Sequence, residues 1–402
     1  MVIVSSLRVA RPLPVLIVPI FALGLATTEL SCFFLLLQLA TGLVFVGLGA
    51  AAGTGGKLAL LLLISSCLGL WRMHRQSHKT GTVLKQELHA ELGSEYQQSI
   101  PASRQVLMRD GVYPQEWLRP FCMRRPGVEK IEDVSYGDAG ERNLLDLYVP
   151  SSARKEGFPV LLQIHGGAWY SGHKQQQTQP LLYHMGQRGW VCVSINYRLS
   201  PQDRFPAHIV DVKKAIGWIR SNIDTYGGNP EFLAVTGGSA GGHLVARAGL
   251  SINDRQFQPG FEEANTQVDA VVPIYGVYDF CDVDGKDLNL AIRNFLGDQV
   301  MPGSIDQCQA LWQGASPICR TEEGAPPFFV IHGNSDVMTS WELAGDFSSR
   351  LRKTSSEVVA YAELPGAQHG FDGMHSVRPG YLENHIASFL EWSYAQKLQL
   401  SI

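Results

Sequence analysis

The stretch FLAVTGGSAGGHLVARAGL, residues 232–250, changes from one local pattern to another around a single serine. Its first part, Phe232–Val235, is a short apolar run typical of a buried strand. Its last part, Ala240–Leu250, has the composition of a helix, and glycines fill most of the short link between them. Ser239 therefore stands where a strand turns at once into a helix, and the fold prediction starts from this turn.

Short apolar runs alternate with helical patterns on both sides of this turn. Because strands that alternate with helices build βαβ units, the pattern predicts an α/β fold with a mostly parallel sheet and helices on both faces. In such sheets, ligands bind beyond the carboxyl ends of the strands. The predicted strands are Lys130–Tyr136, Leu144–Val149, Val160–Ile164, Val191–Ile195, Phe232–Val235, Ala270–Ile274, Phe328–Ile331 and Val358–Glu363, and the predicted helices are His208–Tyr226, Ala240–Leu250, Trp341–Arg352 and Tyr381–Gln399.

The G-x-S-x-G motif at Ser239 has the context that a catalytic nucleophile requires. A strand that turns directly into a helix strains the serine backbone and projects its hydroxyl above the sheet. Gly237 and Gly241 are small because the helix passes very close to the strand. The backbone N–H of Ala240, at the helix N-terminus, points to where an oxyanion would form. We therefore predict Ser239 as the nucleophile and Ala240 as an oxyanion donor.

A second glycine motif, His165-Gly166-Gly167-Ala168-Trp169, follows the predicted strand Val160–Ile164. Two glycines let backbone N–H groups approach a ligand closely, so Gly166 and Gly167 are predicted to complete the oxyanion hole with Ala240. His165 is expected to orient this loop. The alternative is a plain glycine turn without a ligand.

These two motifs together resemble the HGG-type, hormone-sensitive-lipase-like carboxylesterases of the α/β-hydrolases, and most closely the actinobacterial membrane-associated group. The resemblance runs from about Gly127 to the C-terminal helix and includes Tyr197–Pro201, Tyr226–Pro230 and Ala325–Pro327. It implies the α/β-hydrolase fold and hydrolysis of carboxylic esters. Many relatives have a third glycine where this chain has Ala168, whose side chain could narrow the acyl site.

The chain order of that family, serine then acid then histidine, nominates Asp336 in His332-Gly333-Asn334-Ser335-Asp336 and His369 in Gly366-Ala367-Gln368-His369-Gly370-Phe371. Independently of the family, both residues follow predicted strands and both come after Ser239. His369 would accept the serine proton and Asp336 would hold the imidazole, so that an acyl-Ser239 intermediate forms without a metal or an organic cofactor. Asp279 is the second choice of acid. Structural roles are expected for His243, His332, Glu363 and Asp211.

The N-terminal part differs sharply from the rest of the 402 residues. Residues 1–71 hold four of the 70 charged residues, namely Arg8, Arg11, Glu29 and Lys57. The remaining chain is mildly acidic and has no basic cluster, which argues against nucleic-acid binding, while its hydrophobicity excludes intrinsic disorder. Among the seven cysteines, Cys308 and Cys319 could bridge in an oxidising compartment.

Three uncharged runs precede Arg72, at residues 12–28, 30–56 and 58–71. A spanning helix needs about 20 apolar residues, so the middle run is predicted to span a membrane, most strongly over Phe33–Ala52, with one or two further spans around it. A cleaved signal peptide with Pro12–Ala26 as its apolar region is the alternative, although the second run would remain after cleavage. The side of the membrane stays open, because basic residues flank both ends of the N-terminal part.

The predicted organisation is a membrane anchor over residues 1–72, a linker or cap helices over 73–126, and a catalytic domain over 127–402. Leu84, Leu88 and Leu92 recur at a spacing that indicates an amphipathic helix. The segment Cys281–Arg320 is longer than a simple crossover and is expected to add to a cap.

The function predicted from these features is that of a membrane-anchored serine carboxylesterase or lipase acting on short- to medium-chain acyl esters. Its expected partners are an ester substrate, small or lipid-like, and the membrane. Two alternatives stay open, an amidase or formamidase that uses the same triad, and a catalytically silent binding module with this fold.

Overall fold

Eight strands form one sheet in the order β1-β2-β4-β3-β5-β6-β7-β8 in the computed structural model, which describes residues 17–151, 157–286, 290–321 and 324–400. The strands β1 and β2 run antiparallel to their neighbours, and the six strands from β4 to β8 in this order are parallel. The predicted mostly parallel sheet is therefore confirmed. The strands are β1 Val128–Ser135, β2 Leu144–Pro150, β3 Phe158–Ile164, β4 Val191–Ile195, β5 Gly228–Gly238, β6 Ala270–Ile274, β7 Phe328–Gly333 and β8 Val359–Leu364.

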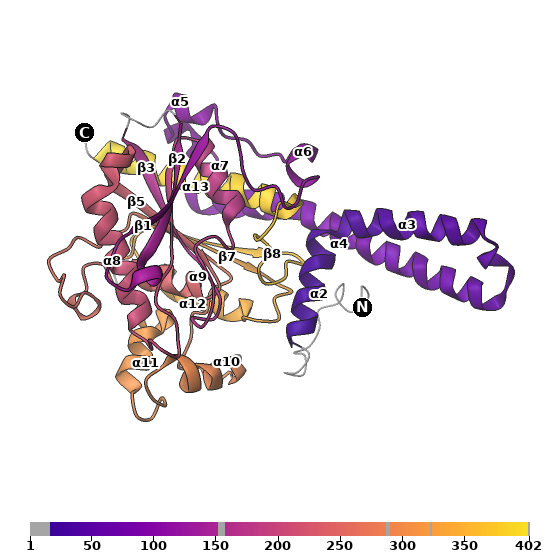
Figure 1. Cartoon of the computed structure of the whole chain (residues 1–402). Helices are drawn as coiled ribbons and strands as arrows, with labels where there is room; N and C mark the ends of the chain where they lie inside the picture. The colour runs from indigo at the N-terminus through magenta and orange to yellow at the C-terminus, as the bar shows by residue number, and fades with distance from the viewer. Residues whose placement is uncertain (1–16, 152–156, 287–289, 322–323, 401–402) are drawn as a thin grey trace.

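Helices cover both faces of this sheet (Figure 1). The predicted helices correspond to α8 Ala207–Asn222 with η5 Ile223–Tyr226, α9 Ala240–Gly249, α12 Trp341–Thr354 and α13 Val377–Leu400, whereas α7 Gln179–Gln187 was not predicted. Side chains of β3 alternate between the faces: Leu162 packs in the core beneath α8, α9 and α12, and Leu161 in the core beneath α7 and α13. Because both faces are buried, the inner strands read as continuous apolar runs.

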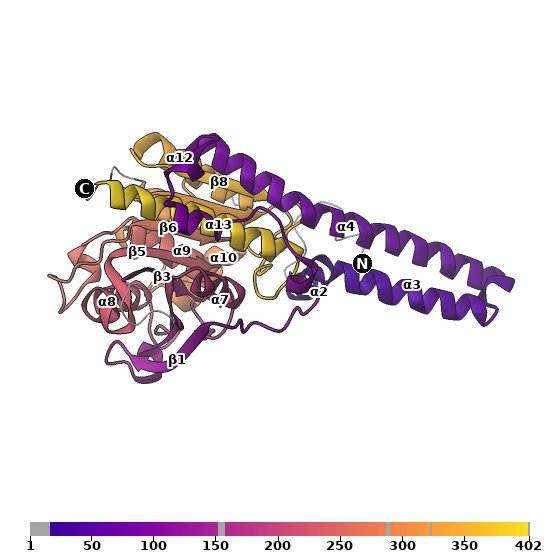
Figure 2. The ribbon, with the colours of Figure 1, turned by 90° about the horizontal axis from the view of Figure 1, so that it is seen from above.

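An antiparallel helical hairpin projects from the catalytic domain (Figures 1 and 2). It consists of α3 Ser31–Gly47 and the first half of α4 Thr54–Leu92, joined through the short η2 Ala50–Ala52. The preceding α2 Ile17–Glu29 bends away from α3 by 82°. By length and apolar composition α4 could cross a membrane, and the bent pair of α2 and α3 could form a second span.

This arrangement corrects the predicted span over Phe33–Ala52. The helix ends at Gly47, because the glycine-rich stretch that follows turns the chain back, with Gly49 in the left-handed region at φ 91°. The third apolar run, short by itself, extends without a break into the polar residues beyond Arg72 and forms the 39-residue helix α4. The predicted boundary between residues 72 and 73 therefore falls inside one helix.

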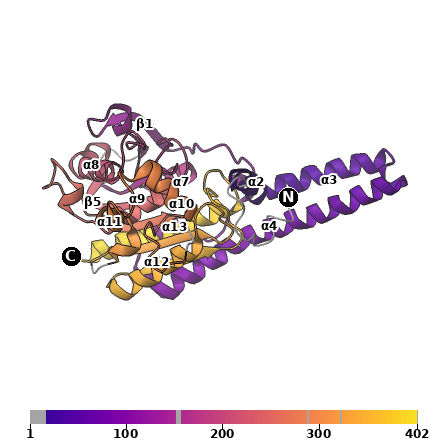
Figure 3. The same ribbon diagram turned by 90° about the horizontal axis from the view of Figure 1, so that it is seen from below.

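The second half of α4 lies along α13 and β8 (Figures 2 and 3). Leu84 and Leu88 are fully buried there, which confirms the amphipathic helix predicted from their spacing. Gly81 gives α13 room to approach, because a Cβ atom at this position would lie 2.4 Å from the ring of Tyr381. This half of α4 therefore packs on the edge of the catalytic domain.

The long segment between β6 and β7 folds into short helices: α10 Leu290–Phe295, the π-helical η7 Leu296–Val300, α11 Gln309–Ala315 and η8 Pro317–Arg320. Trp312 on α11 is buried, and the side chain of Arg204 donates to the backbone oxygens of Met301 and Asp298. Cys308 and Cys319 are both free thiols, so the bridge considered from the sequence is absent. The short pieces before β1 are η3 Tyr96–Ser99, α5 Ala102–Gln105 and α6 Pro114–Trp117, and two other 3-10 turns are η4 Gly140–Asn143 and η6 Arg255–Phe257.

Candidate active site

Ser239 occupies the sharp turn between β5 and α9 with φ 60° and ψ −122°. Residues other than glycine rarely adopt this backbone conformation. A Cβ atom on Gly237 would lie 2.6 Å from the Ile164 carbonyl oxygen, and one on Gly241 would lie 2.0 Å from the same atom. The glycines are therefore required because α9 passes directly against the end of β3, a neighbour of the strand that the sequence prediction had named.

Asp336 and His369 meet at the same edge of the sheet, just after β7 and β8. The Nδ1 atom of His369 lies 2.7 Å from Oδ2 of Asp336, at hydrogen-bonding distance. The other carboxylate oxygen accepts backbone N–H bonds from Met338 and Thr339. Burial raises the pKa of Asp336, but the adjacent His369 and His332 outweigh it and hold that pKa well below its usual range. Asp336 is therefore a fixed negative charge against the imidazole.

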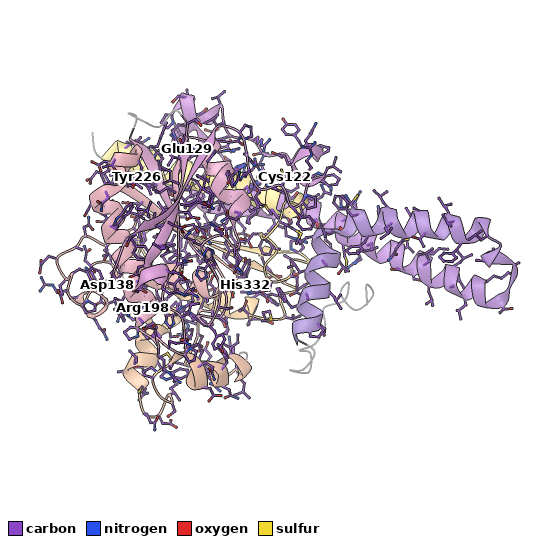
Figure 4. All side chains as sticks on the ribbon, viewed as in Figure 1. Cys122, Glu129, Asp138, Arg198, Tyr226 and His332 are labelled. Carbon is purple, nitrogen blue, oxygen red and sulfur yellow. The ribbon has the colours of Figure 1, made fainter. Side chains whose placement is uncertain are left out.

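Two further observations bear on the choice of acid. His332 lies with Nε2 3.4 Å from Oδ2 of Asp336, so the histidine four residues upstream also packs on the carboxylate. Asp279, the second choice, uses its carboxylate to cap a turn and accepts the backbone N–H groups of Cys281, Asp282 and Val283. Its oxygens are thus committed to the backbone. Figure 4 labels His332 at this edge of the sheet, on the side of the domain nearest α2.

The glycine loop after β3 lies directly against the serine, since a Cβ atom on Gly166 would be 2.9 Å from Cβ of Ser239. The backbone N–H of Gly166 donates to Oε1 of Gln177 at 2.7 Å. The N–H of Gly166, predicted as an oxyanion donor, is therefore bonded to a glutamine side chain in this arrangement. The N–H groups of Gly167 and Ala240 donate to no group in the described part of the chain.

Aromatic and histidine side chains hold this loop in place. His165 stacks on Tyr197 with ring centroids 4.4 Å apart, and the Tyr197 hydroxyl donates to the His165 carbonyl oxygen. The Trp169 indole donates to Nδ1 of His243 on α9 at 3.1 Å. Burial lowers the pKa of His165 to about 4 and that of His243 to about 3, so both imidazoles are neutral at pH 7. Both histidines thus have the packed, structural environment that the sequence reading expected.

A buried network around Tyr275 was not predicted. Tyr275 follows β6, and its ring centroid lies 4.6 Å from that of His369. Its hydroxyl donates to Asp372, which also accepts a hydrogen bond from the Thr178 hydroxyl at 2.8 Å. Burial raises the pKa of Asp372 despite these bonds. Tyr275 therefore packs beside His369. Asp372, which accepts from both Tyr275 and Thr178, joins the histidine loop to the segment before α7.

The helix α2, read from the sequence only as part of the membrane anchor, lies on the histidine loop. The ring of Phe21 stands edge-on to His369 with centroids 6.0 Å apart. At the end of α2, Glu29 forms a buried ion pair with Arg378 on α13 at 2.9 Å and accepts a hydrogen bond from Ser376. The N-terminal part is thus fastened to the catalytic domain beside the site.

We expect Glu29→Gln to lower the free energy of unfolding by about 3–5 kcal/mol, because it leaves the Arg378 guanidinium buried without its counter-charge. Thermal unfolding of the detergent-solubilised full chain measures the effect. The double variant Glu29→Met with Arg378→Met should recover most of the loss, since it removes both charges together. If Glu29→Gln unfolds at the temperature of the unchanged protein, the pair does not fasten α2.

This arrangement is that of the α/β-hydrolase class. A strained serine stands at the carboxyl end of a central parallel strand, a glycine loop follows a neighbouring strand, and an acid and a histidine follow the last two strands. Comparison with known proteins identifies the family within this class. The BD-FAE family model matches residues 145–351. The chain belongs to this family, and the resemblance to α/β-hydrolase esterases predicted from the motifs is confirmed.

Two curated relatives come from Mycobacterium tuberculosis. The probable carboxylic ester hydrolase LipM is 44% identical over 65% of this chain and 61% of its own length. The esterase LipC is 43% identical over 75% of this chain and 76% of its own length. A fungal esterase structure from Rhizomucor miehei aligns with a TM-score of 0.56 at 23% identity, covering 68% of this chain and 86% of that one, and so supports the fold alone. The chain therefore spans less than two thirds of LipM.

Proposed function

We propose that the protein is a carboxylic ester hydrolase that acts through Ser239, His369 and Asp336. The observation that carries this proposal is the 2.7 Å contact between His369 and Asp336 at the edge of the sheet where the strained Ser239 stands. A buried carboxylate on Nδ1 leaves Nε2 of the histidine as the basic nitrogen. The relatives named as esterases agree with ester substrates.

In the proposed reaction, His369 takes the proton of the Ser239 hydroxyl as its oxygen attacks the ester carbonyl carbon. The resulting oxyanion receives the backbone N–H groups of Gly167 and Ala240, and one such donor is worth about 100- to 1,000-fold in rate. The tetrahedral intermediate then expels the alcohol, which takes the proton from His369, and leaves an acyl-serine. Water, deprotonated by His369, attacks this acyl group, and the serine oxygen takes the proton back from His369 as the acid is released.

The hairpin of α3 and α4 is proposed to insert into a membrane. Many of its large apolar side chains are exposed, among them Leu43 at 74% and Leu61 at 63%, and Lys57 is the only charged residue between Leu30 and Trp71. Soluble monomeric proteins rarely expose a continuous apolar surface of this size to water. A hairpin returns both of its ends to the side that holds the catalytic domain. Arg8 and Arg11, the basic residues at the start of the N-terminal part, lie outside the described residues.

The substrate is proposed to be a short- to medium-chain or lipid-like ester that reaches Ser239 past α2. Phe21 supplies an apolar surface beside His369, and α2 leads directly into the membrane hairpin. On α10, the ring of Phe295 lies 6.4 Å from that of Tyr170 in the oxyanion loop, which favours a covering role for the segment between β6 and β7. Apolar covers exclude water and select the acyl chain.

A panel of nitrophenyl esters of increasing acyl length, run beside aryl formamides, tests this function. We expect the full chain in detergent to hydrolyse the short and medium esters fastest and to leave the formamides intact. Faster turnover of the formamides would instead assign an amidase. Folded protein that turns over neither series would favour the silent binding module.

A further inference from the structure

Two segments far apart in the sequence meet at the base of the membrane hairpin. One is Trp71–Arg75, where the apolar half of α4 ends, and the other is the loop from Trp117 to Arg125 after α6. They meet where the ring of Trp117 lies 6.1 Å from that of His74. Figure 1 shows α6 beside the place where the hairpin leaves the domain, and Figure 4 labels Cys122 of the same loop there. We call these two segments the collar.

The collar exposes large apolar side chains. Trp71 is 53% exposed, Leu118 is 52% exposed and Phe121 is 72% exposed. Single exposed apolar residues are ordinary on protein surfaces. These three, however, lie beside the end of an apolar helix, and Trp71 is less than one turn from His74, against which Trp117 packs. The collar therefore continues the apolar surface of the hairpin onto the catalytic domain.

Four exposed arginines belong to the same two segments as these apolar side chains. Arg72, Arg75, Arg119 and Arg124 are exposed, and the described residues offer none of them a carboxylate within ion-pair distance. The Arg75 guanidinium lies 5.6 Å from the centre of the Trp71 ring. By contrast, the neighbouring Arg125 is paired with Glu383. Aromatic rings mixed with arginines are typical of the interface between lipid headgroups and acyl chains, where anionic lipids attract nearby cations.

The length of α4 puts the collar at the depth of that interface. Thr54 to Trp71 covers 18 residues, which span about 27 Å in a helix, close to the roughly 30 Å of a bilayer's hydrocarbon core. With the tip of the hairpin at the opposite boundary, Trp71 reaches the near headgroups. The loop beside it then lies at the same level.

We propose that the collar is a second membrane contact, in which Leu118 and Phe121 enter the headgroup boundary of the leaflet where α4 emerges, and the four arginines bind anionic headgroups. The inference rests on the membrane insertion of the hairpin proposed above. Two attachments hold the catalytic domain at one tilt to the membrane, because tilting about the base of the hairpin would lift the loop from the lipid. The apolar side chains and arginines of the collar thus face the same leaflet from which α4 emerges.

Cys122 allows this contact to be measured in the full chain. It is the one exposed cysteine among the seven, and it follows Phe121 directly. A limiting amount of a polar, environment-sensitive maleimide fluorophore labels it ahead of the five partly exposed cysteines, and Cys122→Ser gives the background labelling. The labelled protein is reconstituted in vesicles of phosphatidylcholine and phosphatidylglycerol that contain quencher lipids of two kinds, one labelled near the headgroup and one labelled along the acyl chain. We expect a blue shift of the emission and a loss of fluorescence on adding the quencher lipid.

Two matched labels separate this inference from the anchoring proposal. With Cys122→Ser in the background, Leu61→Cys reports on the hairpin, and Asp138→Cys reports on an exposed loop on the far side of the domain in Figure 4. Quenching at positions 61 and 122, but not at 138, supports the collar. If the label at position 61 is quenched but the label at position 122 behaves like the one at position 138, the collar does not contact the membrane, while the hairpin does insert. No quenching at position 61 overturns the anchor instead.

A substitution in the loop provides the second readout. Phe121→Asp should abolish the blue shift and the quenching at Cys122, whereas Val106→Asp, at an equally exposed apolar position after α5, should leave both unchanged. The nitrophenyl ester rate in detergent checks that both variants are folded. Unchanged quenching in folded Phe121→Asp would contradict the proposed insertion of this loop.

Discussion

Replacing Ser239 by alanine is expected to lower the rate of ester hydrolysis by roughly 10⁶-fold, the loss typical when a catalytic serine is removed. The residue left at the turn has no hydroxyl to form the acyl intermediate. The backbone is not the cause, because alanine can take the same strained conformation no less readily than serine. Initial rates with a short-chain nitrophenyl ester measure the effect.

The matched control for this prediction is Ser221→Ala. Ser221 is an exposed serine on α8 whose hydroxyl donates to the Gly217 carbonyl oxygen. It should keep the full rate, and both variants should unfold at the temperature of the unchanged protein within a few degrees. Residual activity in Ser239→Ala within tenfold of the unchanged rate would mean that another group is the nucleophile.

Asp336→Asn is expected to lower kcat by about 10⁴-fold with little change in the fold. The asparagine amide can donate to Nδ1 of His369, which places the histidine proton on Nε2, where it can no longer accept one from Ser239. The buried carboxylate also stabilises the imidazolium that forms during attack, and an amide does not. Steady-state kinetics over a range of pH measures the loss.

Asp279→Asn is the informative comparison, because Asp279 is the other acid near a strand end. Its carboxylate accepts three backbone N–H groups of the next turn and is not in contact with His369 in the described structure. We expect kcat of Asp279→Asn to fall far less than that of Asp336→Asn. The reverse order would assign the acid to Asp279.

The elements that could be predicted from the sequence are those with a local cause. Gly237 and Gly241 mark the turn because no side chain fits between α9 and β3, and such a constraint is visible in five consecutive residues. Asp336 and His369 are nominated by the chain order that the family resemblance implies, and both follow predicted strands, where ligands of parallel sheets bind. The sheet could be predicted for the same reason, since each buried strand is a short apolar run.

The contacts that the sequence did not reveal join distant parts of the chain. Gln177 takes the Gly166 N–H through a side chain eleven residues away, and Glu29 meets Arg378 across 349 positions. Neither contact has a spacing or composition signal. Apolar content alone favours a span over Phe33–Ala52, whereas the helix ends at Gly47, and Gly49 and Gly53 lie in the turn of the hairpin.

The most direct test of the central claim is labelling of the folded full chain with a fluorophosphonate, followed by proteolysis and mass spectrometry. This reagent forms a covalent bond with a serine oxygen only where a neighbouring base activates it. The account predicts one adduct, on the peptide that contains Ser239, and strong suppression of that adduct in His369→Ala. Folded protein that stays unlabelled, or an adduct on any other serine, would contradict it.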